Sequence, residues 1–92
     1  MIKIIKKNNR PGITAQGEKR FWLRTGQILA NLAELAEALE QMDENAFCHH
    51  VNPERNDFSI WITDVLGQAK LGAAVRKIKS AKTMAKQIRN YI

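Results

Sequence analysis

Residues 47–67 read FCHHVNPERNDFSIWITDVLG, with apolar residues at helical spacing on both sides of the Asn52-Pro53 pair. The residue before a proline avoids the α conformation, so one helix should end at Asn52. Asn56 or Asp57 can cap a second helix, which Gly67 should terminate. The pattern predicts two short helices folded against each other, and the expected centre of the core consists of Phe47, Val51, Phe58, Trp61, Ile62 and Val65.

Upstream of this stretch, the sequence predicts a hairpin followed by a helix. Residues 21–29 suit two short strands, because Thr25-Gly26 can form a two-residue turn. Asn31 and Glu34 have capping-box spacing, which predicts a helix that runs to about Met42. Its apolar stripe should face the core, while the glutamates point outward. Asp43 should cap the next helix, which begins at Glu44.

Downstream, apolar residues recur every three or four positions from Gln68 to Ile92. This spacing predicts one long amphipathic helix, in which Ser80 marks either a kink or a second start. The outward positions of this segment are basic, and the segment has no acid of its own to relieve the repulsion between its cations.

The chain has 92 residues, of which 45% are hydrophobic and 26% charged, as expected for one globular domain. We predict an α+β fold, mostly α, with a short β-hairpin packed on three or four helices. Residues 1–20 are expected to form a basic N-terminal arm and loop. Residues 21–92 are expected to form a single α+β domain that ends in the long basic helix. Short apolar runs, the lack of a signal peptide and a single cysteine favour a soluble cytoplasmic protein.

The net charge of +6 is strongly segregated along the chain. Residues 1–20 carry six basic residues and one acid, whereas residues 21–64 carry two basic residues and eight acids. Residues 65–92 carry seven basic residues and no acid. Such segregation predicts a polyanionic partner.

Cys48, His49 and His50 are the residues that most resemble metal ligands. Zinc needs four ligands, and the chain has no second Cys or His pair to complete such a set. Consecutive helical residues also point about 100° apart and cannot all face one ion. We therefore expect no metal site. His50 should be packed and hydrogen-bonded near a helix C-terminus, and Cys48 should be buried and inert.

Asp57 and Asp64 are seven residues apart, too distant on a helix for a paired-carboxylate site. Helix capping is the simpler role for Asp57, and Asp64 could pair with Arg24 or His50. With no other catalytic or cofactor motif, we predict a protein that is not an enzyme and has no cofactor.

The predicted function is sequence-independent binding of RNA or DNA through the phosphate backbone, in a ribosome- or nucleoid-associated protein. The alternative is a protein–protein interaction module or homo-oligomer without nucleic acid. A membrane-surface role is disfavoured because the last apolar stripe is rich in Ala and lacks Trp or Phe anchors. Trp22 should either stack on bases or pack under the N-terminal arm. The predicted contact residues are Lys3, Lys6, Lys7, Arg10, Lys70, Lys77, Lys82, Lys86 and Arg89.

The order of motifs resembles a family of small archaeal and bacterial domains of unknown function, over Phe21 to about Val75. The shared pattern is F-x-L-x-x-G, then F-x-x-H-V, then N-D-F-x-x-W-I-x-D-V-x-G. The resemblance implies a common fold unit and a prokaryotic origin, with no assigned activity. The matching letters are Phe21, Leu23, Gly26, Phe47, His50, Val51, Asn56, Asp57, Phe58, Trp61, Ile62, Asp64, Val65 and Gly67.

Overall fold

The computed structural model describes residues 14–92, which form an α+β fold that is mostly helical, as predicted. Five α-helices, one 3-10 turn and two small antiparallel hairpins make up this part of the chain. In order, they are η1 (Gly17–Lys19), β1 (Phe21–Trp22), β2 (Ile28–Leu29), α2 (Leu32–Gln41), α3 (Glu44–His50), β3 (Val51–Asn52), β4 (Arg55–Asn56), α4 (Asp57–Asp64), α5 (Ala69–Val75) and α6 (Ala81–Tyr91).

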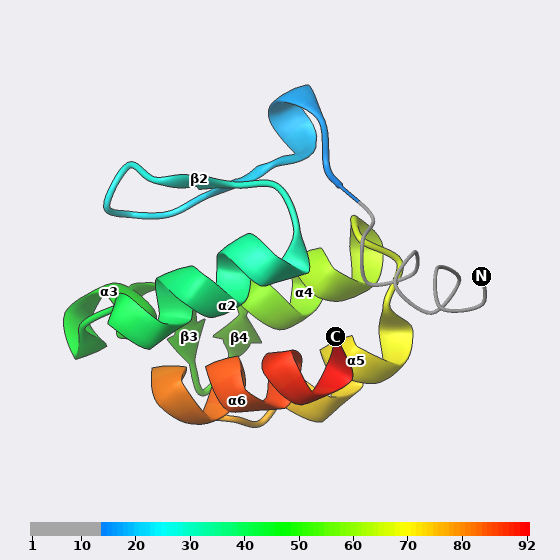
Figure 1. The fold of residues 1–92 in the computed structure, drawn as a ribbon. Coiled ribbons are helices and arrows are strands. Elements are labelled where there is room, and N and C mark those ends of the chain that lie inside the picture. The colour runs from blue at the N-terminus through cyan, green and yellow to red at the C-terminus, as the bar shows by residue number, and fades with distance from the viewer. Residues whose placement is uncertain (1–13) are drawn as a thin grey trace.

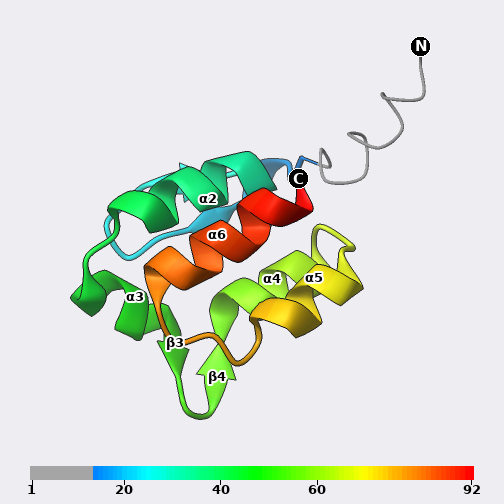
Figure 2. The ribbon, with the colours of Figure 1, turned by 60° about the horizontal axis from the view of Figure 1, so that its bottom comes forward.

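The helices pack as two neighbouring pairs beneath the first hairpin. Helix α2 packs against α6 and α4 packs against α5, while α5 also contacts α6 (Figure 2). The β1–β2 hairpin and η1 lie at the top of Figure 1, and α6 lies at the bottom. The basic segments around residue 20 and along α6 therefore belong to opposite sides of the molecule.

The β1–β2 hairpin pairs Phe21 with Leu29 and Trp22 with Ile28. Its connection differs from the predicted two-residue turn. The Leu23 N–H donates to the Gln27 carbonyl at 2.9 Å, which leaves the three residues 24–26 in the loop. Gly26 has a φ of 100°, a conformation that glycine adopts readily and that three-residue hairpin loops use.

The predicted core centre is largely confirmed. Phe47, Phe58, Trp61 and Ile62 are buried, whereas Val51 and Val65 are only partly covered. The Phe58 ring stacks on both Phe21 and Phe47, with centroids 5.1 and 5.9 Å away. The Trp61 indole N–H donates to the Lys19 carbonyl at 2.9 Å, which ties η1 to α4 across the core.

The predicted helix starts are confirmed by side-chain caps. Asn31 Oδ1 accepts from the Glu34 N–H at 2.9 Å, and Glu34 Oε1 accepts from the Ala30 N–H at 2.7 Å. Asp43 caps α3 in the same way, through the Ala46 N–H at 2.8 Å. Each bond satisfies a backbone donor that the first helical turn leaves without a partner.

Residues 51–56 form a second hairpin, where the sequence predicted only the end of a helix at Asn52. Val51 pairs with Asn56 and Asn52 pairs with Arg55. The Asn52 side chain accepts from the backbone N–H groups of Glu54 and Arg55, which closes the turn. Two-residue strands are too short to produce an alternating pattern, so periodicity could not reveal them.

The predicted long final helix is two helices, with the second start at Ser80. The Asn56 amide donates to the carbonyls of Val75 and Arg76, at 3.1 Å each. In a continuous helix these two carbonyls would accept from residues 79 and 80. The Ser80 hydroxyl instead accepts from the Thr83 N–H and caps α6.

Candidate nucleic-acid interface

The break between α5 and α6 creates an ordered turn with three cations. This basic turn spans residues 76–80 and reads RKIKS. The Asn56 amide holds its first carbonyl, and the Ile78 side chain packs against the core. Arg76, Lys77 and Lys79 are exposed, and the structure pairs none of them with a carboxylate of residues 14–92. The backbone of the turn is thus fixed while its charged groups remain available.

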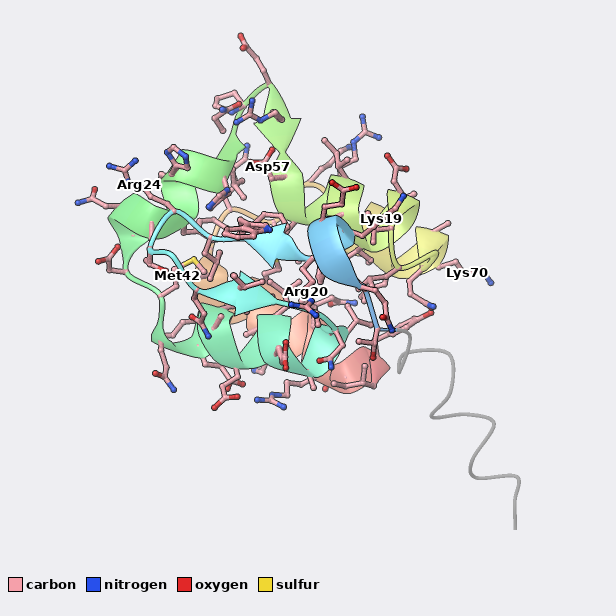
Figure 3. All side chains as sticks on the ribbon, turned by 90° about the horizontal axis from the view of Figure 1, so that it is seen from above. Lys19, Arg20, Arg24, Met42, Asp57 and Lys70 are labelled. Atoms are coloured by element: carbon pink, nitrogen blue, oxygen red, sulfur yellow. The ribbon has the colours of Figure 1, made fainter. Side chains whose placement is uncertain are left out.

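Among the predicted contact residues on the two last helices, Lys70 and Lys86 are also exposed and without an ion pair in the described part of the chain. Lys70 projects from one end of the molecule in Figure 3. Together with the basic turn, these residues form a series of unpaired cations along α5 and α6. Arg76 and Lys79 were not among the predicted contact residues, and the break between α5 and α6 places them in one turn with Lys77.

Lys82 and Arg89, in contrast, both bind Glu40 of α2. The Arg89 Nε and Nη2 donate to the two carboxylate oxygens at 2.9 Å each, and Lys82 Nζ donates to the Glu40 carbonyl at 3.1 Å. The Arg89 hydrogen bonds hold the pKa of the Glu40 carboxyl below its usual value, and Glu40 in turn raises the pKa of Arg89. Arg89 therefore finds an acid on the neighbouring helix, contrary to the expected absence of relief, whereas Lys82 binds a backbone carbonyl.

These groups border a shallow surface depression of about 320 Å³, lined by Glu40, Lys82, Ala85, Lys86 and Arg89. Three cations and one carboxylate leave the lining with an excess of positive charge. The depression is suited to attract an anion, although Glu40 competes for two of its cations.

The remaining basic residues lie elsewhere. The upper side of the molecule, which faces the viewer in Figure 3, carries three of them along η1 and the first hairpin: Lys19, Arg20 and Arg24. The predicted arm residues Lys3, Lys6, Lys7 and Arg10 lie outside the described residues.

His50 uses both ring nitrogens to hold the fold together. It is buried, and its Nε2 accepts from the Arg24 backbone N–H at 3.1 Å. The ring proton is therefore on Nδ1, which faces Asp57 Oδ2 at 3.1 Å. Arg55 Nε binds the other Asp57 oxygen at 2.8 Å. The partner of His50 is thus Asp57, and the suggested pairing with Asp64 is wrong.

The residue types that can bind a metal ion do not gather in one place within residues 14–92. Cys48 is exposed, contrary to expectation, because α3 turns residues 46, 47 and 50 toward the core. Within residues 14–92, no group of three or more His, Cys, Asp or Glu residues could hold a metal ion. No helix in the same range combines the length and apolar character needed to cross a membrane.

A model for a protein family of unknown function, DUF5752, matches residues 15–92. The match begins at Ala15, the first buried residue of the described chain, and includes the basic turn and α6. Neither a curated protein nor a solved structure matches this sequence.

Proposed function

This chain belongs to the DUF5752 family, and we propose that it binds the phosphate backbone of RNA or DNA without reading the base sequence. The observation that supports this function is the basic turn. Three cations lie within four residues of an ordered segment, and none is paired with a carboxylate of the described chain. The contact surface would comprise the basic turn together with Lys70 and Lys86.

The clustering of cations on this surface favours a polyanion over a single small anion. Like charges held close together repel, and a polyphosphate chain relieves several of these repulsions at once. Binding releases the counterions that are condensed on the nucleic acid, so affinity should depend steeply on salt. Lysine and arginine contacts to phosphate position a protein on a strand but carry no sequence information.

Such a ligand could be ribosomal RNA or nucleoid DNA, and either would place the protein in the cytoplasm. Lys82 and Arg89 would take a secondary part, because Glu40 already binds both. The arm residues Lys3, Lys6, Lys7 and Arg10 would add further phosphate contacts.

The test is the salt dependence of binding to a DNA duplex of about 20 base pairs. The variant Arg76→Gln/Lys77→Gln/Lys79→Gln removes the charges of the basic turn. Its slope of log affinity against log salt should fall by about 2 to 3, since each lost phosphate contact removes about 0.9. The matched control, Lys19→Gln/Arg20→Gln/Arg24→Gln, removes the same charge from the opposite side and should lose much less.

Equal losses in the two triple variants would show that net charge alone drives binding, and would exclude the basic turn as the site. Wild-type protein that does not bind RNA or DNA at low salt would refute the function itself. Circular dichroism of each variant checks that all three chains are folded.

A further inference from the structure

The first hairpin exposes a tryptophan to solvent on its outer face. Trp22 is 62% exposed, and its cross-strand partner Ile28 is 39% exposed. Phe21 and Leu23 point into the core, so the alternation along the strand turns Trp22 outward. No described residue covers this pair, and a large exposed aromatic group beside an aliphatic one is typical of a contact surface.

Two arginines flank Trp22 along the chain. Arg20 has an extended backbone and precedes Trp22 by two residues, which places both on one side of the strand. Arg24 lies in the turn at the tip of the same hairpin, and Figure 3 shows both arginines on the side that faces the viewer. Neither arginine forms an ion pair with a carboxylate of residues 14–92.

A surface depression of about 340 Å³ lies on this side of the hairpin and is bordered by Arg20 and Ile28. Glu34 also borders it, but its carboxylate already accepts the Ala30 N–H. The chain enters the base of the hairpin here, where the Ala15 N–H donates to the Ala30 carbonyl at 2.7 Å. The sequence before Thr14 carries four more cations and no acid.

We infer that the outer face of the β1–β2 hairpin is a stacking site for unpaired bases, and that the protein prefers single-stranded nucleic acid to duplex. A flat aromatic face between cations fits a ligand with flat apolar rings joined by anionic links. A duplex keeps its bases stacked on one another and offers no free ring faces. This inference rests on the proposed function and adds the strand state of its ligand.

The test compares a 20-nucleotide oligothymidylate with a 20-base-pair duplex. Trp61 is buried and bound to the Lys19 carbonyl, so quenching of tryptophan emission on titration with the single strand reports on Trp22. Trp22→Ala should weaken single-strand binding by about five- to 150-fold, the range for one stacked base. Duplex binding should stay within about twofold of wild type, and Trp22→Phe should retain most of the affinity. Ile60→Ala is the matched control, because Ile60 is an exposed apolar residue of α4, with 49% of its surface accessible, and is not part of the hairpin.

The possible outcomes distinguish a failure of the stacking site from a failure of the proposed function. If duplex binds and Trp22→Ala leaves single-strand affinity unchanged, the stacking site is refuted while the proposed function stands. If neither nucleic acid binds to the wild type, both fall. An equal loss for duplex and single strand refutes the strand preference. A wild-type dimer that Trp22→Ala dissociates, with no change in single-strand affinity, assigns the face to self-association and overturns the inference.

Discussion

Arg89 holds the carboxylate of Glu40 through two parallel hydrogen bonds, although 49 residues separate the two along the chain. The pair joins the acidic face of α2 to the basic face of α6, and it divides the cations of α6 into two classes. Arg89 has a carboxylate partner, whereas Lys86 and Lys82, which binds the Glu40 backbone carbonyl, have none in the described chain. The acidic middle of the sequence thus offsets part of the charge of its basic end.

The variant Glu40→Gln should therefore bind nucleic acid more tightly than wild type. It removes the only carboxylate bordering the α6 depression and frees Arg89 for phosphate contact, while Lys82 keeps its bond to the backbone carbonyl of residue 40. We expect a several-fold gain in duplex affinity and a salt slope that is steeper by up to about 0.9 per new contact. The measurement is fluorescence anisotropy over a range of salt concentrations. Weaker binding would mean that Glu40 helps to orient these cations for the ligand.

The same pair makes stability depend on pH. Arg89 lowers the pKa of Glu40 in the folded chain below the value of 4.5 expected when unfolded. The stabilisation is therefore fully present above pH 4.5 and is lost as the pH falls through the lower folded pKa. As the pH is lowered through that range, the urea midpoint of wild type should approach the urea midpoint of Glu40→Gln. High salt at pH 7 should shrink the difference too, because the pair is exposed. A difference that persists at low pH would indicate packing rather than charge.

His50→Leu should destabilise the fold by about 1–3 kcal/mol, the usual effect of leaving buried polar groups without partners. The change removes the acceptor of the Arg24 N–H and the partner of Asp57. Urea denaturation gives the free energy, and hydrogen exchange should show faster exchange at the Arg24 amide. His49→Leu is the control, because His49 is exposed and should stay within about 0.5 kcal/mol. Equal losses of unfolding free energy in the two variants would show that the hydrogen bonds of His50 do not stabilise the fold.

Asn56→Asp separates the two tasks of one side chain. An aspartate can still accept from the Ser59 N–H and cap α4, but it loses the two donors to Val75 and Arg76. We expect a loss of about 1–3 kcal/mol in unfolding free energy and faster hydrogen exchange around the basic turn. Asn31→Asp is the matched control, since Asn31 donates no such pair of bonds and both residues cap well.

Gly72→Val should disrupt the contact between α4 and α5. A Cβ at Gly72 would overlap the Thr63 hydroxyl and approach the Ser59 carbonyl oxygen to 3.1 Å. Overpacking of this kind costs about 1–3 kcal/mol. Thr63→Ala in the same chain should restore part of the loss, which a double-mutant cycle measures. Ala73→Val, at the exposed neighbouring position, controls for the helix propensity of valine. An equal loss in the control would exclude the packing explanation.

The features that could be predicted from the sequence are those with local causes. Asn31, Asp43 and Asn56 cap helices within three residues of themselves, and Gly67 follows α4 with a positive φ of 70°. The break after Val75 has a distant cause, because the Asn56 amide donates hydrogen bonds to two backbone carbonyls about 20 residues later in the chain. Periodicity alone left open whether Ser80 is a kink or a second start, and only tertiary contacts decide it.

The candidate site shows the same division. The segregation of charge was visible in the sequence, and so were Lys70, Lys77 and Lys86 as exposed cations. The gathering of Arg76 and Lys79 with Lys77 required the helix break, and the pairing of Arg89 with Glu40 required the packing of α2 against α6. The outward direction of Trp22 followed from strand alternation, whereas its flanking arginines became informative only once the structure paired neither of them with a carboxylate of residues 14–92.

The packing of α2 against α6 has a consequence for synthesis on the ribosome. Glu40 emerges 49 residues before its partner Arg89, an interval on the order of 2 to 10 seconds at elongation rates of roughly 5–20 residues per second. During that interval, the flank of α2 that later receives α6 has no partner from its own chain. A nascent chain at this stage is a natural client for a chaperone near the exit tunnel, and the finished domain should form only after α6 has cleared it.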